Sequence, residues 1–100
     1  MVQSRLTKAA RMDQVVEFQT YDENGEGLTL FFRNGAVFTV SEDGITDNVI
    51  DVMTNSGEPV FFEKFGGSFV YYDDESNITY RMSAADVDDL VFANSWEGWD

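Results

Sequence analysis

The chain contains no cysteine and no histidine among its 100 residues. Without thiolate and imidazole ligands the common zinc sites cannot form, and the Ser-His and Cys-His nucleophile pairs are excluded. Hydrolysis would have to depend on carboxylates, tyrosines or one of only two lysines. We therefore predict a protein that is not an enzyme, that has no catalytic or metal-binding residues, and that uses no cofactor.

Long apolar runs are also missing, and none approaches the roughly 18 residues that a membrane-spanning helix requires. The first residues are basic through Arg5, Lys8 and Arg11, but they lack the apolar segment of a signal peptide. The absence of cysteine removes any disulfide framework typical of small secreted domains. These features predict a cytoplasmic protein without membrane contact, located in the host cell cytoplasm if the chain is viral.

Positive charge is scarce in the rest of the chain. Nineteen acidic side chains stand against six basic ones, which gives a formal net charge of −13. Residues 1–11 hold three of the six bases and no acid, so the remainder carries all the acids with only Arg33, Lys64 and Arg81. The negative electrostatic field of such a chain repels nucleic acid and attracts basic protein surfaces. The rate of association with a basic surface falls as the salt concentration rises. The predicted partner is the basic surface of a nucleic-acid-binding protein, and no direct nucleic acid binding by this chain is predicted.

Apolar residues are plentiful enough for one folded domain, since 43% of the chain is hydrophobic and 15% is aromatic. Short alternating segments, separated by turns about every eight to twelve residues, are typical of antiparallel strands. We predict a mainly β (α+β) fold, a small curled antiparallel sheet or barrel-like fold of about six to seven short strands with one C-terminal helix. The predicted divisions are a basic arm or marginal helix at 1–13, a β-rich domain at 14–94 with its helix at 84–94, and a Trp-containing tail at 95–100.

The densest apolar stretch, residues 28–40, predicts a central hairpin. Its dipeptide Asn34-Gly35 suits a two-residue type I′ turn, in which both central residues have positive φ. That turn would place Phe31 opposite Phe38 and leave apolar side chains on both faces of the hairpin. The interpretation is a strand pair covered on both sides.

A second hairpin is predicted over residues 60–72. It would turn at Gly66-Gly67, with Lys64 opposite Phe69 and Phe61 opposite Tyr72.

The predicted C-terminal helix has a recognisable start and an apolar side. Ser83 is the expected N-cap and Asp86 the acid at the third helical position, where the helix dipole favours negative charge. At 100° per residue, four apolar residues share one arc, which should face the sheet: Ala84, Val87, Leu90 and Val91.

The acids fall into four clusters, at residues 22–26, 42–47, 73–75 and 86–89. The first three belong to predicted turns, of which the second is residues 41–44, and the last lies on the predicted helix. Carboxylates on i and i+2 of a strand lie roughly 7 Å apart on one face, a spacing comparable to that of nucleic-acid phosphates. The leading hypothesis is an acidic inhibitory binding protein, a DNA mimic that blocks the DNA- or RNA-binding surface of a host nuclease or defence effector, as anti-restriction and anti-CRISPR proteins of phages do. The predicted acidic binding surface consists of Asp22, Glu23 and Glu26; Glu42, Asp43 and Asp47; Asp73, Asp74 and Glu75; and Asp86, Asp88 and Asp89.

Two other functions stay open at this point. In the first, the chain is a viral or phage structural module whose basic arm and tryptophan tail dock onto neighbouring subunits, so that a homo-oligomer can form. Trp96 and Trp99 would then anchor a partner, although folding back onto the domain is the favoured interpretation of these two residues. In the second, the charge is an adaptation to salt and has no partner at all.

Two local patterns resemble ligand sites only in part. Residues 22–27 approach the opening of an EF-hand loop, but the twelfth position is Arg33 and the flanks are strands, so no calcium site is predicted. Several aromatic residues could floor a ligand groove, although core packing is the favoured interpretation of aromatics at alternating strand positions. They are Tyr21, Phe65, Tyr71, Tyr72 and Tyr80.

Overall fold

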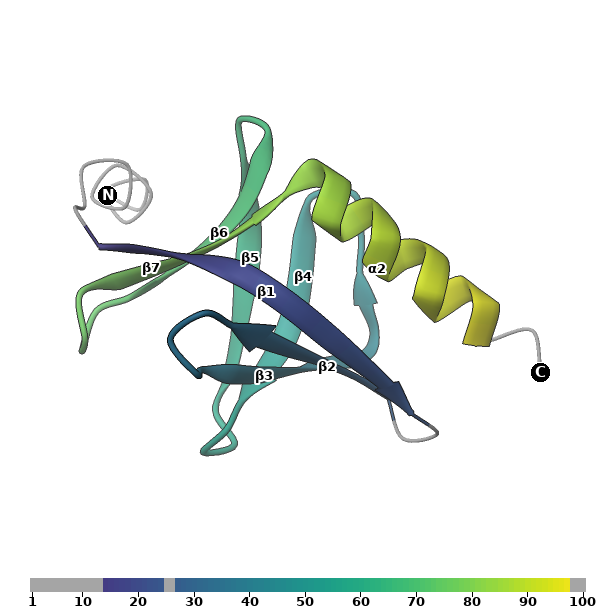
Figure 1. Cartoon of the computed structure of the whole chain (residues 1–100), viewed down its shortest axis with the longest axis horizontal. Helices are drawn as coiled ribbons and strands as arrows, with labels where there is room; N and C mark the ends of the chain where they lie inside the picture. The colour runs from purple at the N-terminus through teal and green to yellow at the C-terminus, as the bar shows by residue number, and fades with distance from the viewer. Residues whose placement is uncertain (1–13, 25–26, 98–100) are drawn as a thin grey trace.

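The computed structural model describes residues 14–24 and 27–97, which form seven strands and a helix (Figure 1). The elements are β1 (Val15–Asn24), β2 (Gly27–Phe32), β3 (Val37–Ile45), β4 (Val49–Thr54), β5 (Pro59–Phe65), β6 (Ser68–Asp73), β7 (Ile78–Ser83) and α2 (Ala84–Glu97). The mainly β fold with one C-terminal helix is thereby confirmed. The predicted basic arm at 1–13 lies outside the described residues. No helix in the described part of the chain is long and apolar enough to span a membrane.

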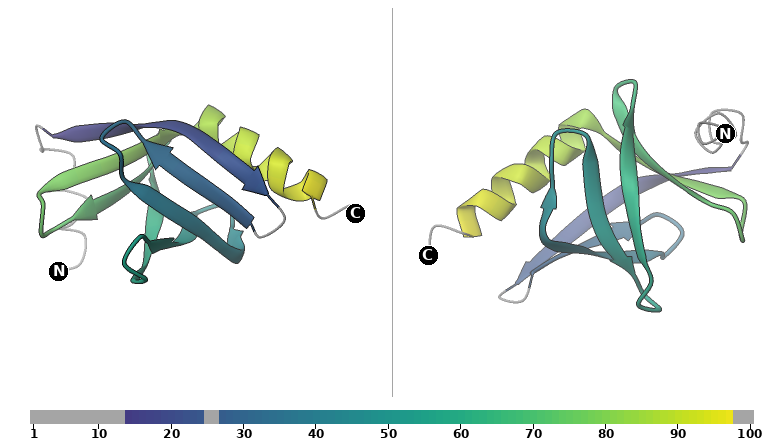
Figure 2. Two further views of the ribbon diagram at one scale, coloured as in Figure 1. Left: turned by 60° about the horizontal axis from the view of Figure 1, so that its bottom comes forward. Right: turned by 180° about the vertical axis from the view of Figure 1, so that it is seen from behind.

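The strands form a closed barrel in which each strand pairs with its neighbours in the sequence. All these pairs are antiparallel except the closing one, in which Val15–Glu17 pairs in parallel with Thr79–Arg81. The sheet curls far enough for β7 to return beside β1, as the two views of Figure 2 show. Closure gives every strand two neighbours, which removes the exposed sheet edges that favour aggregation.

A cluster of aromatic rings fills the barrel. Phe32 stacks on Phe62 with ring centroids 5.7 Å apart, and Phe38 meets both rings edge-on at 5.4 and 5.5 Å. Tyr80 lies edge-on to Phe32 and to Phe38, at 5.2 Å in each case. Stacked and edge-on arrangements at these separations are the favourable ones for aromatic pairs. The rings of distant strands are thus held in one rigid core.

The register predicted for the first hairpin is wrong by one residue. The structure pairs Leu30 with Phe38 and Phe31 with Val37, in place of Phe31 with Phe38. A one-residue slip moves side chains to the opposite face of a strand. Phe38 therefore joins Leu30 in the core, while Phe31 and Val37 are only partly buried. The hairpin has one core face and not two.

The reason for this slip is the length of the turn. The amide of Phe32 donates to the carbonyl of Ala36 at 3.0 Å, which closes a three-residue loop. Gly35 ends the loop at φ 92, and the Asn34 side chain accepts a hydrogen bond from the Ala36 amide at 3.1 Å. Three-residue hairpin loops commonly end on a residue of this conformation, most often glycine.

The second hairpin follows the prediction only near its turn. Lys64 pairs with Phe69 as expected, but the pairing ends at Glu63 and Val70. The predicted pair of Phe61 with Tyr72 is absent from the β5–β6 register, because the two strands diverge beyond that point. A cleft of about 240 Å³ lies there, lined by residues of both strands.

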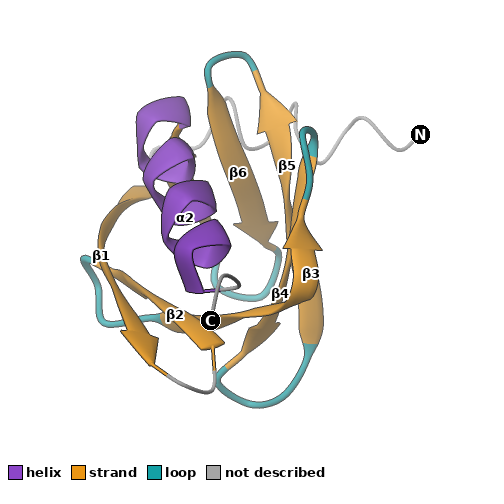
Figure 3. Cartoon of the chain, turned by 90° about the vertical axis from the view of Figure 1, so that its right-hand side faces the viewer, coloured by secondary structure: helices purple, strands orange, loops and turns teal. Residues whose placement is uncertain are grey.

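Helix α2 lies across the end of the barrel at which β1, β3, β5 and β7 finish, with β1 and β6 on either side (Figure 3). Val87 and Leu90 point into the core and are buried. The predicted arc is wrong at both of its ends, because Ala84 is exposed and Val91 is 42% exposed. The helix continues to Glu97, beyond the predicted end at Asn94.

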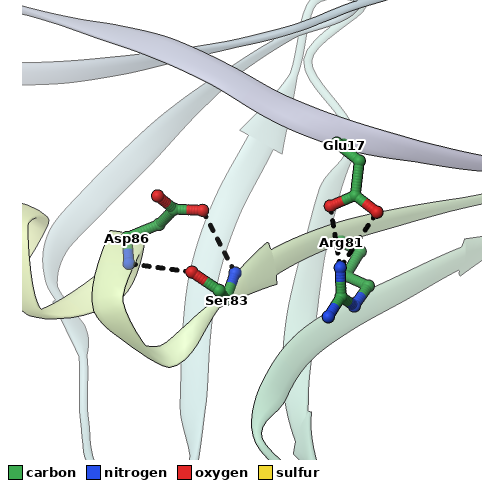
Figure 4. Close-up of polar contacts among 4 residues, drawn as sticks. All are labelled: Glu17, Arg81, Ser83 and Asp86. Atoms are coloured by element: carbon green, nitrogen blue, oxygen red, sulfur yellow. Dashed lines mark hydrogen bonds and ion pairs between the residues drawn. The ribbon is translucent and has the colours of Figure 1, made fainter.

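The start of α2 is the predicted cap. The Asp86 amide donates to Oγ of Ser83 at 3.1 Å, and the Ser83 amide donates to Oδ2 of Asp86 at 3.2 Å (Figure 4). This reciprocal pair is a capping box, which satisfies two amides at the helix terminus. Figure 4 also shows Arg81 of β7 donating to both carboxylate oxygens of Glu17 on β1, each at 2.9 Å, across the parallel seam.

Thr79 on β7 carries a polar atom that the fold leaves unsatisfied. Its side chain is 2% exposed, and its Oγ1 has no hydrogen-bond partner among the residues that the structure describes. Replacing a buried, unpaired hydroxyl by a methyl group of the same shape removes a desolvation cost. We expect Thr79→Val to raise the free energy of unfolding by about 1 kcal/mol in urea titrations. The control Thr79→Ser keeps the hydroxyl and loses the methyl group, so it should lower stability; a stabilising Ser variant would contradict this account.

Candidate protein-binding surface

The barrel has two ends with different connections. In an antiparallel meander, alternate connections emerge at the same end, so those after β1, β3 and β5 share one end with the start of α2. We call this the helix end. The connections after β2, β4 and β6 lie at the other, which we call the opposite end.

Three of the four predicted acidic clusters lie at the helix end. They come from the end of β1, from the end of β3 with its following turn, and from the first turns of α2. The fourth cluster, residues 73–75, lies at the opposite end, and Glu26 lies outside the described residues. The described acids of the predicted surface at the helix end are Asp22, Glu23, Glu42, Asp43, Asp47, Asp86, Asp88 and Asp89.

Residues 41–44 were predicted as an acidic turn, and this is wrong, because they form a bulge inside β3. The register passes from Val40 opposite Val52 to Ile45 opposite Ile50, so four residues of β3 stand against Asp51 alone. A bulge of this kind bends a strand and redirects its side chains. Glu42 and Asp43 are exposed on it, and Asp43 adopts φ 58.

The true turn between β3 and β4 follows at residues 46–48. Oγ1 of Thr46 accepts a hydrogen bond from the Val49 amide at 3.1 Å, and the Thr46 amide donates to the Val49 carbonyl at 2.9 Å. Asp47 is exposed in this turn. The bulge and the turn together present three carboxylates within six residues, 42–47.

Gly44 makes the bulge possible. A Cβ at this buried position would lie 2.7 Å from the carbonyl oxygen of Asp51 and 2.8 Å from that of Ser41. Because both atoms are backbone, Gly44→Ala should force the bulge to shift, and we expect a loss of about 1–3 kcal/mol in unfolding free energy. Gly67→Ala is the matched control, since a Cβ there meets nothing within 4 Å. Equal effects of the two variants in denaturant titrations would contradict the assignment.

Two predicted site acids are engaged in holding local structure. Asp86 closes the helix cap described above. Oδ1 of Asp73 accepts a hydrogen bond from the Glu75 amide at 3.2 Å, and Oδ2 accepts one from the Ser76 hydroxyl at 2.8 Å. Substitution of either acid would therefore disturb the fold as well as the charge.

One acid at this surface was not predicted. Asp51 is exposed on β4, directly opposite the bulge that carries Glu42 and Asp43. Its neighbours Ile50 and Val52 are buried, as the alternation of a half-buried strand requires. This alternation in the sequence could have placed Asp51 on the outer face.

A second missed residue is Phe92 on α2, whose side chain is 70% exposed. At 100° per residue it lies about 140° from Val87 around the helix, away from the buried arc. Asp88 and Asp89 precede it by one turn on the same side and are also exposed. The predicted anchor Trp96 occupies the last turn of α2, but its side chain, like all of Trp99, lies outside what the structure describes.

The aromatic residues considered for a ligand groove do not gather in one. Tyr71 and Tyr80 stack in the core at 6.1 Å, Tyr72 is buried, and Phe65 is 44% exposed on β5. A cleft of about 350 Å³ at the opposite end includes Tyr71 and Tyr80 in its wall, but neither Phe65 nor Tyr21.

Comparison with known proteins identifies no relative of this chain. The chain matches no protein-family model, and searches of curated proteins and of solved structures gave no significant match. Within residues 14–24 and 27–97, no group of three or more side chains is placed to hold a metal ion.

Proposed function

We propose that this protein is an acidic inhibitory binding protein of the nucleic-acid-mimic type, which occupies the basic DNA- or RNA-binding surface of another protein. The observation that carries the proposal is that β1, the β3 bulge and α2 all place carboxylates at the helix end of one barrel. They belong to a chain with a formal net charge of −13.

The barrel holds the carboxylates at fixed positions, which a flexible acidic tail would not do. A basic groove that binds duplex DNA is matched to phosphates spaced about 3.4 Å apart along each strand. Carboxylates held on a closed, hydrogen-bonded barrel keep their spacing on binding, so little conformational entropy is lost. The cap at Ser83 fixes the first turn of α2 in the same way.

The fitting partner is a nuclease or defence effector of the restriction or CRISPR type. Such proteins hold their substrate in a positively charged channel. An acidic protein seated in that channel excludes the nucleic acid by occupancy, and it needs no chemistry of its own. This accords with a chain that lacks cysteine and histidine.

The test is a DNA-cleavage assay with a panel of purified restriction endonucleases and CRISPR effector nucleases. We expect inhibition of at least one, with an apparent inhibition constant that rises with DNA concentration and with salt between about 0.05 and 0.2 M. An apparent inhibition constant that changes with neither DNA concentration nor salt would contradict the proposal. The absence of inhibition across the whole panel would contradict it as well.

The fold should persist at low ionic strength, which separates a mimic from a salt-adapted protein. At about 10 mM salt the screening length is about 30 Å and repulsion among the acids is at its strongest. We expect the circular dichroism spectrum and cooperative melting to be retained there, because the aromatic core and closed barrel hold the chain together. Loss of structure at low salt would favour salt adaptation instead.

A further inference from the structure

Helix α2 has an outward face on which no described element packs. Ala85, Asp88, Asp89 and Phe92 recur at helical spacing on this face, and all four are exposed. Phe92 is 70% exposed, compared with 49% for Phe61 and 44% for Phe65. A large aromatic side chain in this position has most of its apolar surface in water and gains free energy when a partner covers it.

The neighbouring charges select the kind of partner. Asp89 and Asp88 stand three and four residues before Phe92, and i, i+3 and i, i+4 positions are neighbours on a helix surface. A second copy of this chain would bring like charges together, and nucleic acid or an anionic membrane would be repelled. A protein surface with an apolar site bordered by lysine or arginine is complementary to both the ring and the carboxylates.

We propose that Phe92 is the apolar anchor of the acidic surface and inserts into an apolar site within the basic surface of the partner. The inference rests on the proposed function, because it assigns an anchor to the same surface. Val87 and Leu90 fix the opposite side of α2 to the core, so the anchor is presented from a rigid element. Preorganisation of this kind lowers the entropic cost of binding.

Two synthetic helical peptides with identical lysine positions provide the probe. One carries leucine on its other face and the second carries glutamine, so they differ in apolar surface and not in charge. By fluorescence anisotropy at fixed salt, we expect the wild-type protein to bind the leucine–lysine peptide about tenfold more tightly. Phe92→Ala should lose this preference and still bind the glutamine–lysine peptide, whereas the control Phe65→Ala should keep both properties.

The outcomes distinguish a failure of the Phe92 anchor from a failure of the proposed function. A Phe92→Ala variant that keeps the preference, or a Phe65→Ala variant that loses it, overturns the anchor and leaves the acidic surface intact. Binding of neither peptide by the wild-type protein overturns both. In the charge-reversal variant Glu42→Lys with Asp47→Lys, binding of both peptides should weaken alike. If sedimentation velocity shows self-association that Phe92→Ala abolishes, the occupant is a second copy, and the proposed basic partner is wrong.

Discussion

Reversing two charges at the helix end, Glu42→Lys together with Asp88→Lys, is expected to weaken inhibition of a susceptible nuclease by about 10- to 100-fold at low salt. Both side chains are exposed, one on the β3 bulge and one on α2, and neither forms a hydrogen bond or ion pair with the residues that the structure describes. Each lysine replaces an attraction to the basic groove by a repulsion. The measurement is the apparent inhibition constant in the cleavage assay, after circular dichroism has shown the fold to be intact.

The matched control places the same change at the opposite end of the barrel. Glu58→Lys together with Glu75→Lys alters the net charge by the same amount, and both of these side chains are exposed as well. This variant should inhibit nearly as well as the wild-type protein. If the two variants lose inhibition equally, the effect depends on net charge and not on the helix end, and the proposed surface is wrong.

Truncation of Phe62 to alanine is expected to have the largest effect on stability. Its side chain is fully buried at 0% exposure, and its ring contacts Phe32, Phe38 and Tyr71 at centroid distances of 5.7, 5.5 and 5.8 Å. Phe→Ala changes in cores cost about 3–5 kcal/mol, through lost burial and the cavity left behind. Since small domains are stable by only about 5–15 kcal/mol, this variant should be marginally folded or unfolded at 25 °C.

The exposed phenylalanine of the same strand provides the comparison. Phe65 follows Phe62 by three residues on β5, and it is 44% exposed. Phe65→Ala should change the free energy of unfolding in urea titrations by less than about 1 kcal/mol. A Phe62→Ala loss no larger than that of Phe65→Ala would contradict the central place of Phe62 in the core.

Local patterns predicted much of the fold. The apolar stretch at residues 28–40 predicted a pair of strands, which β2 and β3 form, although the predicted cover on both faces was wrong because β2 buries only alternate side chains. The Ser83 cap was predicted correctly, since the serine and Asp86 are three residues apart and interact within a single helical turn. The pairing of Lys64 with Phe69 followed from the glycines of the turn between them.

The candidate site was predicted in part. The acids were identified in the sequence, but their grouping was not, because alternate connections share an end only once the strand order is known. Phe92 was missed although the helical angle that placed Val87 inside also places it outside. Its exposure becomes informative only when the barrel shows which side of α2 is covered.

The sequence by itself determined the charge, the strand and helix content, the cap of α2 and the absence of cysteine and histidine chemistry. These properties depend on composition or on residues a few positions apart. Only the tertiary structure decided the three-residue loop at Asn34-Gly35, the bulge at residues 41–44 and the parallel seam between β1 and β7. Each of these is selected by which side chains fit together in the core, and the seam joins residues that are more than sixty positions apart, so no local pattern could specify it.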